Sequence, residues 1–141
     1  MNEDEIQYLE KALNNENNES LINLTFDKID KKKREIFEEL DLPTIQIKKF
    51  LKKLEDYRYI EEIQELQYGN YFRWINLNNP ENLKLTTGGI LCEIKVDNTI
   101  HLVFKNNMNR FFEINMEENI IFQKFSDQER IILYALDHLE N

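Results

Sequence analysis

Apolar and polar residues follow two different periods along this chain, one typical of helices and the other of strands. In the first half, apolar residues recur every three or four positions, which predicts helices over residues ~3–14, ~26–40 and ~44–56. In the second half the period is two, and turn segments rich in Asn, Asp and Glu separate the alternating runs. A final helix over residues ~127–139 is indicated by a capping box, because Ser126 stands three residues before Glu129.

Between these halves, residues ~59–77 are expected to form a β-hairpin around Tyr68-Gly69-Asn70, because Gly and Asn tolerate the positive φ angles of tight turns. The polar loop Asn78–Asn82 is the expected domain boundary, with one region over residues 1–79 and another over residues 80–141. The predicted fold class is α+β. An N-terminal helical region with its β-hairpin precedes an antiparallel β-meander (~83–124), which the C-terminal helix caps.

Residues 37–60, FEELDLPTIQIKKFLKKLEDYRYI, are predicted to form a helix, a short turn and a second helix. Pro43 suits a turn or a helix start, and Ile47, Leu51 and Leu54 share one stripe of the second helix. This pattern resembles the helix-turn-helix of winged-helix proteins over residues ~20–77, although Arg58 stands where that family usually has glycine. The resemblance implies that region 1–79 is winged-helix-like, that the hairpin is the wing, and that the second helix enters the DNA major groove.

The net charge of −9 opposes general affinity for nucleic acid. The charge is uneven, however, because residues 26–60 hold ten lysines and arginines against eight acids, while the segments before and after are acidic. The predicted helix-turn-helix is therefore the positive part of an acidic chain. A solvated amphipathic helix also has lysines opposite an apolar stripe, so the pattern by itself leaves that interpretation open.

Two function classes follow from these observations, and the first is double-stranded DNA binding without catalysis. Its expected contacts come from the start of the second helix, from the helix face beyond it, and from two arginines: Thr44, Gln46, Lys48, Lys49, Lys52, Lys53, Arg58 and Arg73. The alternative is a protein–protein interaction or assembly module with the same fold. Its expected surface includes the hairpin aromatics Tyr71 and Trp74 and the final-helix residue Tyr134, and a second copy of the chain is one candidate partner.

No set of residues indicates catalysis, a metal site or a cofactor. The chain has two histidines and one cysteine, Cys92, which the strand pattern assigns to the apolar core. The run Thr86-Thr87-Gly88-Gly89 is similar to a phosphate-binding loop, but a strand follows it instead of a helix, so a bend between strands is the favoured interpretation. We therefore expect a protein that is not an enzyme.

The segment Tyr68–Lys95, with YGNYFRWINL followed by LTTGGILCEI, resembles an uncharacterised protein family of large cytoplasmic DNA viruses. That resemblance implies a viral protein and carries over no catalytic residue, and the winged-helix hypothesis then implies a role in viral transcription or genome handling. A single cysteine suits a reducing compartment, no apolar run is long enough to span a membrane, and the acidic N-terminus does not match a signal peptide. The expected location is the host cytoplasm, with the virion or the nucleus as alternatives.

Overall fold

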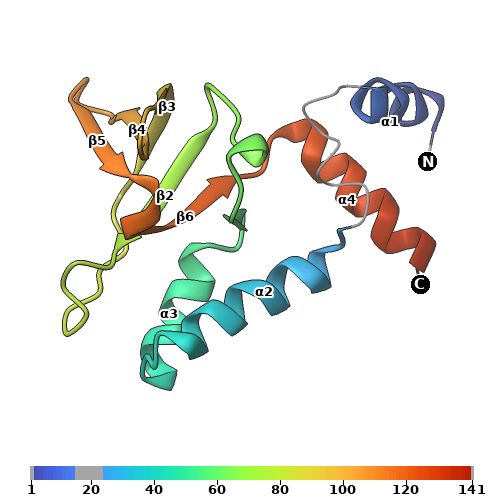
Figure 1. Cartoon of the computed structure of the whole chain (residues 1–141). Coiled ribbons are helices and arrows are strands. Elements are labelled where there is room, and N and C mark those ends of the chain that lie inside the picture. The colour runs from blue at the N-terminus through green and yellow to red at the C-terminus, as the bar shows by residue number, and fades with distance from the viewer. Residues whose placement is uncertain (1, 15–23, 141) are drawn as a thin grey trace. The chain divides into compact units, whose positions relative to one another are not determined.

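The computed structural model describes residues 2–14 and 24–140, and its contacts divide the chain into two units. A helical unit comprises Met1–Leu51 and Phe125–Asn141, and a sheet unit comprises Lys52–Lys124. Figure 1 shows the helices and strands of both, with labels on all of them except β1. The α+β class predicted from the sequence is confirmed. None of the helices in the described ranges is long and apolar enough to cross a membrane.

The helical unit is built from α1 (Glu3–Asn14), α2 (Phe26–Glu39), most of α3 (Thr44–Lys53) and α4 (Asp127–Glu140). In this unit α4 packs along α1 and also contacts α2. A small apolar core joins the three helices with Phe125, two residues before α4. Its buried members are Ala12, Ile29, Phe125, Ile132 and Leu133. The rings of Phe26 and Phe125 meet edge to face, with centroids 5.9 Å apart.

Side-chain caps fix the ends of α2 and α4. The predicted capping box is confirmed, because the Ser126 hydroxyl accepts the Glu129 N–H at 3.1 Å and the Glu129 carboxylate accepts the Ser126 N–H at 3.0 Å. At the start of α2, the Thr25 hydroxyl accepts the Lys28 N–H. The Asp137 carboxylate of α4 accepts the Phe26 N–H at 3.1 Å, so α4 also caps α2.

The turn between α2 and α3 lies where the sequence places it. Asp41 adopts a left-handed conformation with φ of 56°, which ends α2 and lets the Leu42 N–H reach the Phe37 carbonyl. The aromatic rings of Phe37 on α2 and Phe50 on α3 then lie 5.6 Å apart. This ring contact fixes the buried side of α3 and leaves its lysines on the surface.

The sheet unit contains one six-stranded antiparallel sheet in the order β1-β6-β2-β3-β4-β5. Its strands are β1 (Tyr57–Ile60), β2 (Tyr71–Asn76), β3 (Gly89–Val96), β4 (Ile100–Lys105), β5 (Phe111–Asn115) and β6 (Asn119–Lys124). Strands β2 to β5 form a meander. A short 3₁₀ turn, Met116–Glu118, then leads into β6, which returns to the far side of β2.

The predicted hairpin over residues 59–77 does not form. Strand β1 ends at Ile60, and β1 and β2 each pair with β6 instead of with one another. The reason is that the first five residues of β6 are all buried, so the backbone N–H and C=O groups at both of its edges need partners, and β1 and β2 supply them. The predicted domain boundary at residues 79 and 80 is wrong for the same reason, because β2 pairs with strands that lie beyond it.

A β-bulge in β3 corrects the prediction that Cys92 lies in the core. The register between β3 and β4 shifts between Leu91 and Glu93, so that Leu91 and Ile94 point to the core side while Cys92 is exposed. The core of the unit includes Phe72, Trp74, Leu91, Leu102, Phe104 and Ile121. The prediction from the sequence assumed a strict period of two, which does not allow for the one residue that a bulge inserts.

Residues 86–89 form a close backbone approach, which agrees with the prediction of a bend. Gly88 has φ of 87°, and a Cβ atom built on it would lie 1.9 Å from the Phe72 carbonyl oxygen. Gly69 also has a positive φ, 82°, but a Cβ atom there would meet nothing within 4 Å. The two glycines thus share a positive φ and differ in the space around them.

We predict that Gly88→Ala lowers the free energy of unfolding by about 3 kcal/mol or more, because it adds a steric clash to an unfavourable φ angle. The matched variant Gly69→Ala should lose only about 1 kcal/mol, since it bears the φ cost alone. Urea denaturation of both variants measures the difference. Equal losses would show that the contact with β2 does not constrain Gly88.

Candidate nucleic-acid interface

Helix α3 carries most of the residues that the sequence assigns to DNA binding. Its sequence, TIQIKKFLKK, contains no acidic residue, and the lysines at spacings of one and four residues share a face. Lys48, Lys49, Lys52 and Lys53 are all exposed, as is Thr44 at the helix start, whereas Gln46 is partly buried. The apolar Phe50 is buried on the opposite side, so the helix presents its charge outward.

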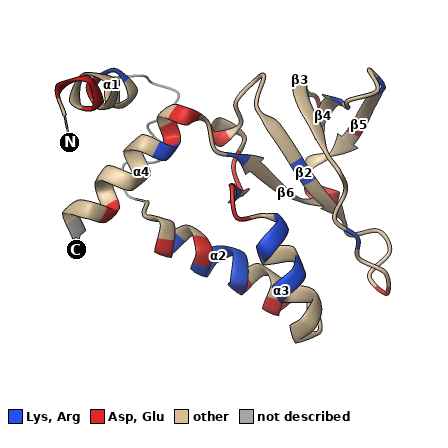
Figure 2. Ribbon diagram, turned by 180° about the vertical axis from the view of Figure 1, so that it is seen from behind, with Lys and Arg blue, Asp and Glu red and all other residues tan. Residues whose placement is uncertain are grey.

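The ammonium groups of these four lysines have no ion-pair partner among the residues that the structure describes. Figure 2 shows blue Lys segments and no red ones on α3, while α2 carries both blue and red segments. Helix α2 alternates both signs, and its Arg34 pairs with Asp30 at 2.8 Å. The lysines of α3 therefore form a cluster of exposed cations that can meet an external anion.

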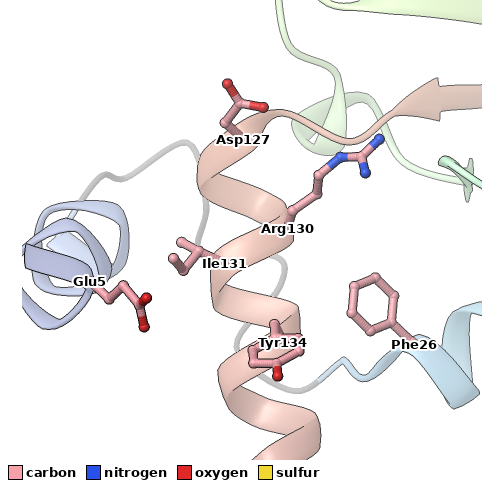
Figure 3. Close-up of a pocket in the computed structure, with 6 residues that line it drawn as sticks. All are labelled: Glu5, Phe26, Asp127, Arg130, Ile131 and Tyr134. Carbon is pink, nitrogen blue, oxygen red and sulfur yellow. The ribbon is translucent and has the colours of Figure 1, made fainter. Parts of the chain in front are cut away.

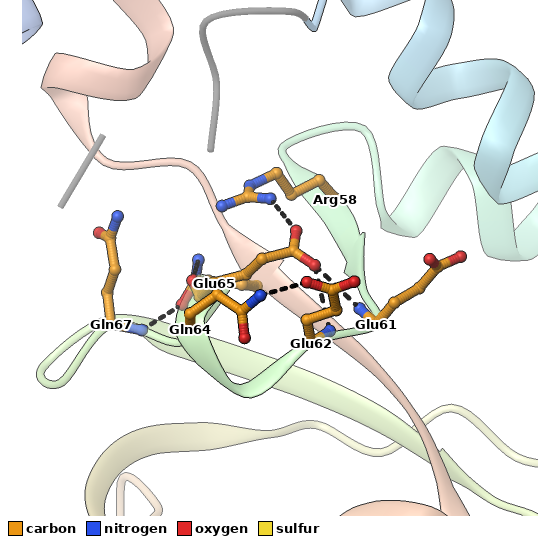
Figure 4. Close-up of polar contacts among 7 residues, drawn as sticks. Arg58, Glu61, Glu62, Gln64, Glu65 and Gln67 are labelled. Atoms are coloured by element: carbon orange, nitrogen blue, oxygen red, sulfur yellow. Dashed lines mark hydrogen bonds and ion pairs between the residues drawn. The ribbon is translucent and has the colours of Figure 1, made fainter. Parts of the chain in front are cut away.

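Arg58 is not available for a phosphate contact, which corrects that part of the prediction. Its side chain is 2% exposed, and its guanidinium donates to the Glu65 carboxylate at 2.7 Å (Figure 4). The other oxygen of Glu65 accepts the backbone N–H groups of Glu61 and Glu62, so the whole turn is arranged around this ion pair. Arg58 is thus a buried charge that belongs to the fold.

Arg73 and Tyr71 support the bend at residues 86–89. The Arg73 guanidinium donates to the Thr86 carbonyl at 2.8 Å, and the Tyr71 hydroxyl donates to the Thr87 carbonyl at 2.7 Å. Both side chains are partly buried. Burial raises the pKa of the nearby Tyr57 hydroxyl, and the charge of Arg73 opposes that shift. Arg73 therefore already has a structural role in the sheet unit.

Trp74 is a core residue, which corrects the prediction that it belongs to an interaction surface. It is 6% exposed, and its ring stacks on Phe104 with centroids 4.4 Å apart and an interplanar angle of 24°. Alternation along β2 puts Trp74 on the same face as Phe72, which is fully buried. The pattern identified two candidate faces and could not tell which one packs inward.

Tyr134 is 67% exposed and borders a groove in the helical unit. Figure 3 shows its side chain on α4 among the residues that line one cavity of about 580 Å³, between the starts of α1, α2 and α4. A second cavity of about 460 Å³ shares Glu5 and Tyr134 with the first and continues between α1 and α4 toward Leu139. The sequence signalled only a wide apolar surface on the last helix, since the partner helix α1 lies at the other end of the chain.

Comparison with known proteins assigns no relative: no family model, curated protein or solved structure matches the chain. Within the described ranges, no cluster of three or more His, Cys, Asp or Glu side chains could hold a metal ion. The argument about function therefore depends on the surfaces described above.

We predict that Arg58→Ala lowers the free energy of unfolding by about 3 kcal/mol, because it leaves the Glu65 carboxylate without its buried partner. Thermal denaturation measures the loss. The control is Arg34→Ala, which removes an exposed ion pair of similar length and should change stability little. An Arg58→Ala variant that keeps its stability would contradict the structural role.

Proposed function

We propose that this chain is a non-enzymatic DNA-binding module that contacts the phosphates of double-stranded DNA through α3. The observation that carries the proposal is the set of four exposed lysines on an acid-free helix, Lys48, Lys49, Lys52 and Lys53. Lysines on one helix face can neutralise several phosphates at once, and the release of counterions supplies affinity. In the viral setting that the sequence resemblance implies, such a module would serve transcription or genome handling.

The proposed contacts depend on the helix and not on a wing. In the winged-helix mode of binding, residues near the start of the second helix approach base edges while the rest of the helix follows the backbone. Thr44 and Gln46 occupy that start, and the lysines lie in the following turns. Since the hairpin that would have been the wing does not form, the proposal assigns no minor-groove contact to it.

The acidic remainder of the chain supports one defined orientation on DNA. With a net charge of −9, most of the surface repels phosphates, so a polyanion is attracted mainly where cations gather. Such a protein should have a low overall affinity for DNA. In the complex, its α3 face should point toward the duplex. We expect phosphate contacts to supply the affinity and Thr44 or Gln46 any sequence preference.

The first prediction for this function concerns Lys48→Glu combined with Lys52→Glu. The unaltered chain should bind a short labelled duplex with log Kd changing by about 3 to 4 per tenfold change in salt, as four phosphate contacts require. The double variant should lose measurable binding at low salt. Fluorescence anisotropy titrations at two salt concentrations measure both quantities.

The matched control is Lys84→Glu combined with Lys124→Glu, which makes the same change in net charge at two exposed lysines of the sheet unit. Its binding should stay close to that of the unaltered chain. Equal losses in the two double variants would mean that only total charge matters, and no binding by the unaltered chain at low salt would refute DNA binding.

A second candidate function is a protein–protein interaction module, which the groove between α1 and α4 favours. Apolar side chains there are left on the surface, with Tyr134 67% and Leu139 80% exposed. Large exposed apolar patches are typical of interaction sites in soluble proteins. This surface involves no residue of α3, so the two functions can be tested separately.

We predict that Tyr134→Lys changes the free energy of unfolding by less than about 0.5 kcal/mol, because an exposed side chain that serves a partner contributes little to the isolated fold. Leu133→Lys, one position earlier and fully buried, should instead prevent stable folding. Thermal denaturation separates the two. A loss of about 2 kcal/mol or more in Tyr134→Lys would show that this tyrosine is needed for packing.

A further inference from the structure

The last strand of the meander, β5, has one edge that no strand in the described part of the chain covers. It pairs with β4 on one side only. A hydrogen bond in the turn before β5 shows which backbone groups of β5 face β4. The Asn106 N–H donates to the Arg110 carbonyl, and these two residues are opposite one another in the register that pairs β4 with β5. Alternation then points the N–H and C=O groups of Phe112 and Ile114 toward β4, and those of Phe111 and Glu113 toward the open edge.

The hydrophobic core also reaches the surface at this edge. Leu91, Phe104 and Phe112 face one another across three adjacent strands, with Leu91 and Phe104 buried and Phe112 still 45% exposed. Phe111, on the opposite face of β5, is 64% exposed. The row of core side chains thus ends in a half-exposed ring, beside backbone groups that can still pair with another strand.

The features by which proteins usually protect an edge strand are missing from β5. Such edges commonly carry proline, a bulge or an outward lysine. The sequence FFEIN has neither proline nor lysine, and its register with β4 is regular. Its one charged residue, Glu113, is paired with Lys95 at 2.8 Å, which reduces the repulsion of an approaching strand.

We propose that β5 pairs with β5 of a second copy of this chain, antiparallel, about a two-fold axis at Phe112. In this register the two Phe112 rings lie directly opposite one another at a non-hydrogen-bonded position, where cross-strand side chains come closest. Phe111 and Glu113 of each copy form the hydrogen-bonded pairs on either side. The sheet becomes continuous across the dimer, and each Phe112 extends the core row of the other copy.

The chemistry of the strand favours this register over a two-fold axis at Glu113. That alternative would place two carboxylates directly opposite each other, which is unfavourable in a sheet. It would also pair Phe111 with Asn115, whose carbonyl already accepts the Asn119 side-chain amide at 2.8 Å. Of these two registers, the one with its two-fold axis at Phe112 is therefore the one that suits a second copy of the chain.

The direct test is disulfide trapping in a chain whose exposed native cysteine has been removed by Cys92→Ser. With Phe112→Cys added, mild oxidation should give a cross-linked dimer, since opposite non-hydrogen-bonded positions bring two Cβ atoms within disulfide range. Glu113→Cys in the same background tests the competing register and should stay uncross-linked. A Val96→Cys variant, exposed on β3, controls for random collisions.

Sedimentation velocity of the unaltered chain provides a measurement that needs no cysteine. A short strand contact should give a dimer with Kd of about 10–100 μM. Phe112→Lys and Phe111→Lys should each shift the chain to monomer, and Val96→Lys should not. A chain that is monomeric at all concentrations, or one that cross-links through Glu113→Cys and not Phe112→Cys, would overturn the proposal. Lys48→Glu with Lys52→Glu should leave the dimer intact, so the dimer stands or falls independently of DNA binding.

Discussion

Strand β6 is the element on which the sheet unit depends, because it is paired on both edges and buried along almost its whole length. It joins β1 and β2, which the chain connects through residues 61–70. That connection is fixed to β6 by the buried Gln123 side chain, whose amide oxygen accepts the Gln67 N–H and whose amide nitrogen donates to the Glu65 carbonyl. Strand β6 therefore determines the positions of β1, β2 and the connection between them.

This arrangement engages two of the basic residues that the sequence assigned to DNA binding. Because Glu65 is held beside β1, Arg58 has a partly buried carboxylate partner and becomes part of the fold. Arg73 supports the bend at residues 86–89 in a similar way. The lysines of α3 form no ion pair within the described residues. We propose α3 as the nucleic-acid contact because of this difference, and not because of the number of basic residues. The acidic surface elsewhere restricts the orientation in which DNA could approach.

Local signals predicted the parts of the fold that depend on local structure. The helix periods, the Ser126–Glu129 capping box and the turns between β3, β4 and β5 each involve residues close in sequence, so the pattern contains the whole interaction. The insertion of β6 between β1 and β2 could not be predicted in this way, because a period of two gives the buried faces of a strand and not its neighbours. The error over the hairpin, and with it the predicted wing, follows from that limit.

The candidate site was predictable to the same extent. The lysines of α3 form a helical face that the sequence displays directly, whereas the burial of Arg58 and Trp74 depends on strands more than 25 residues away in the chain. The groove beside Tyr134 joins the two ends of the sequence, and the exposure of Cys92 depends on a one-residue bulge. In each case the missing information was a contact between distant segments.

The measurement that tests the central claim most directly is a titration of the isotope-labelled chain with a short DNA duplex, followed by amide chemical shifts in NMR spectra. We predict that the largest shift changes fall within Thr44–Lys53, with small changes in β3 to β5, and that they diminish as salt is raised. Changes concentrated in the sheet, or the absence of any change at low salt, would contradict the assignment of DNA binding to α3.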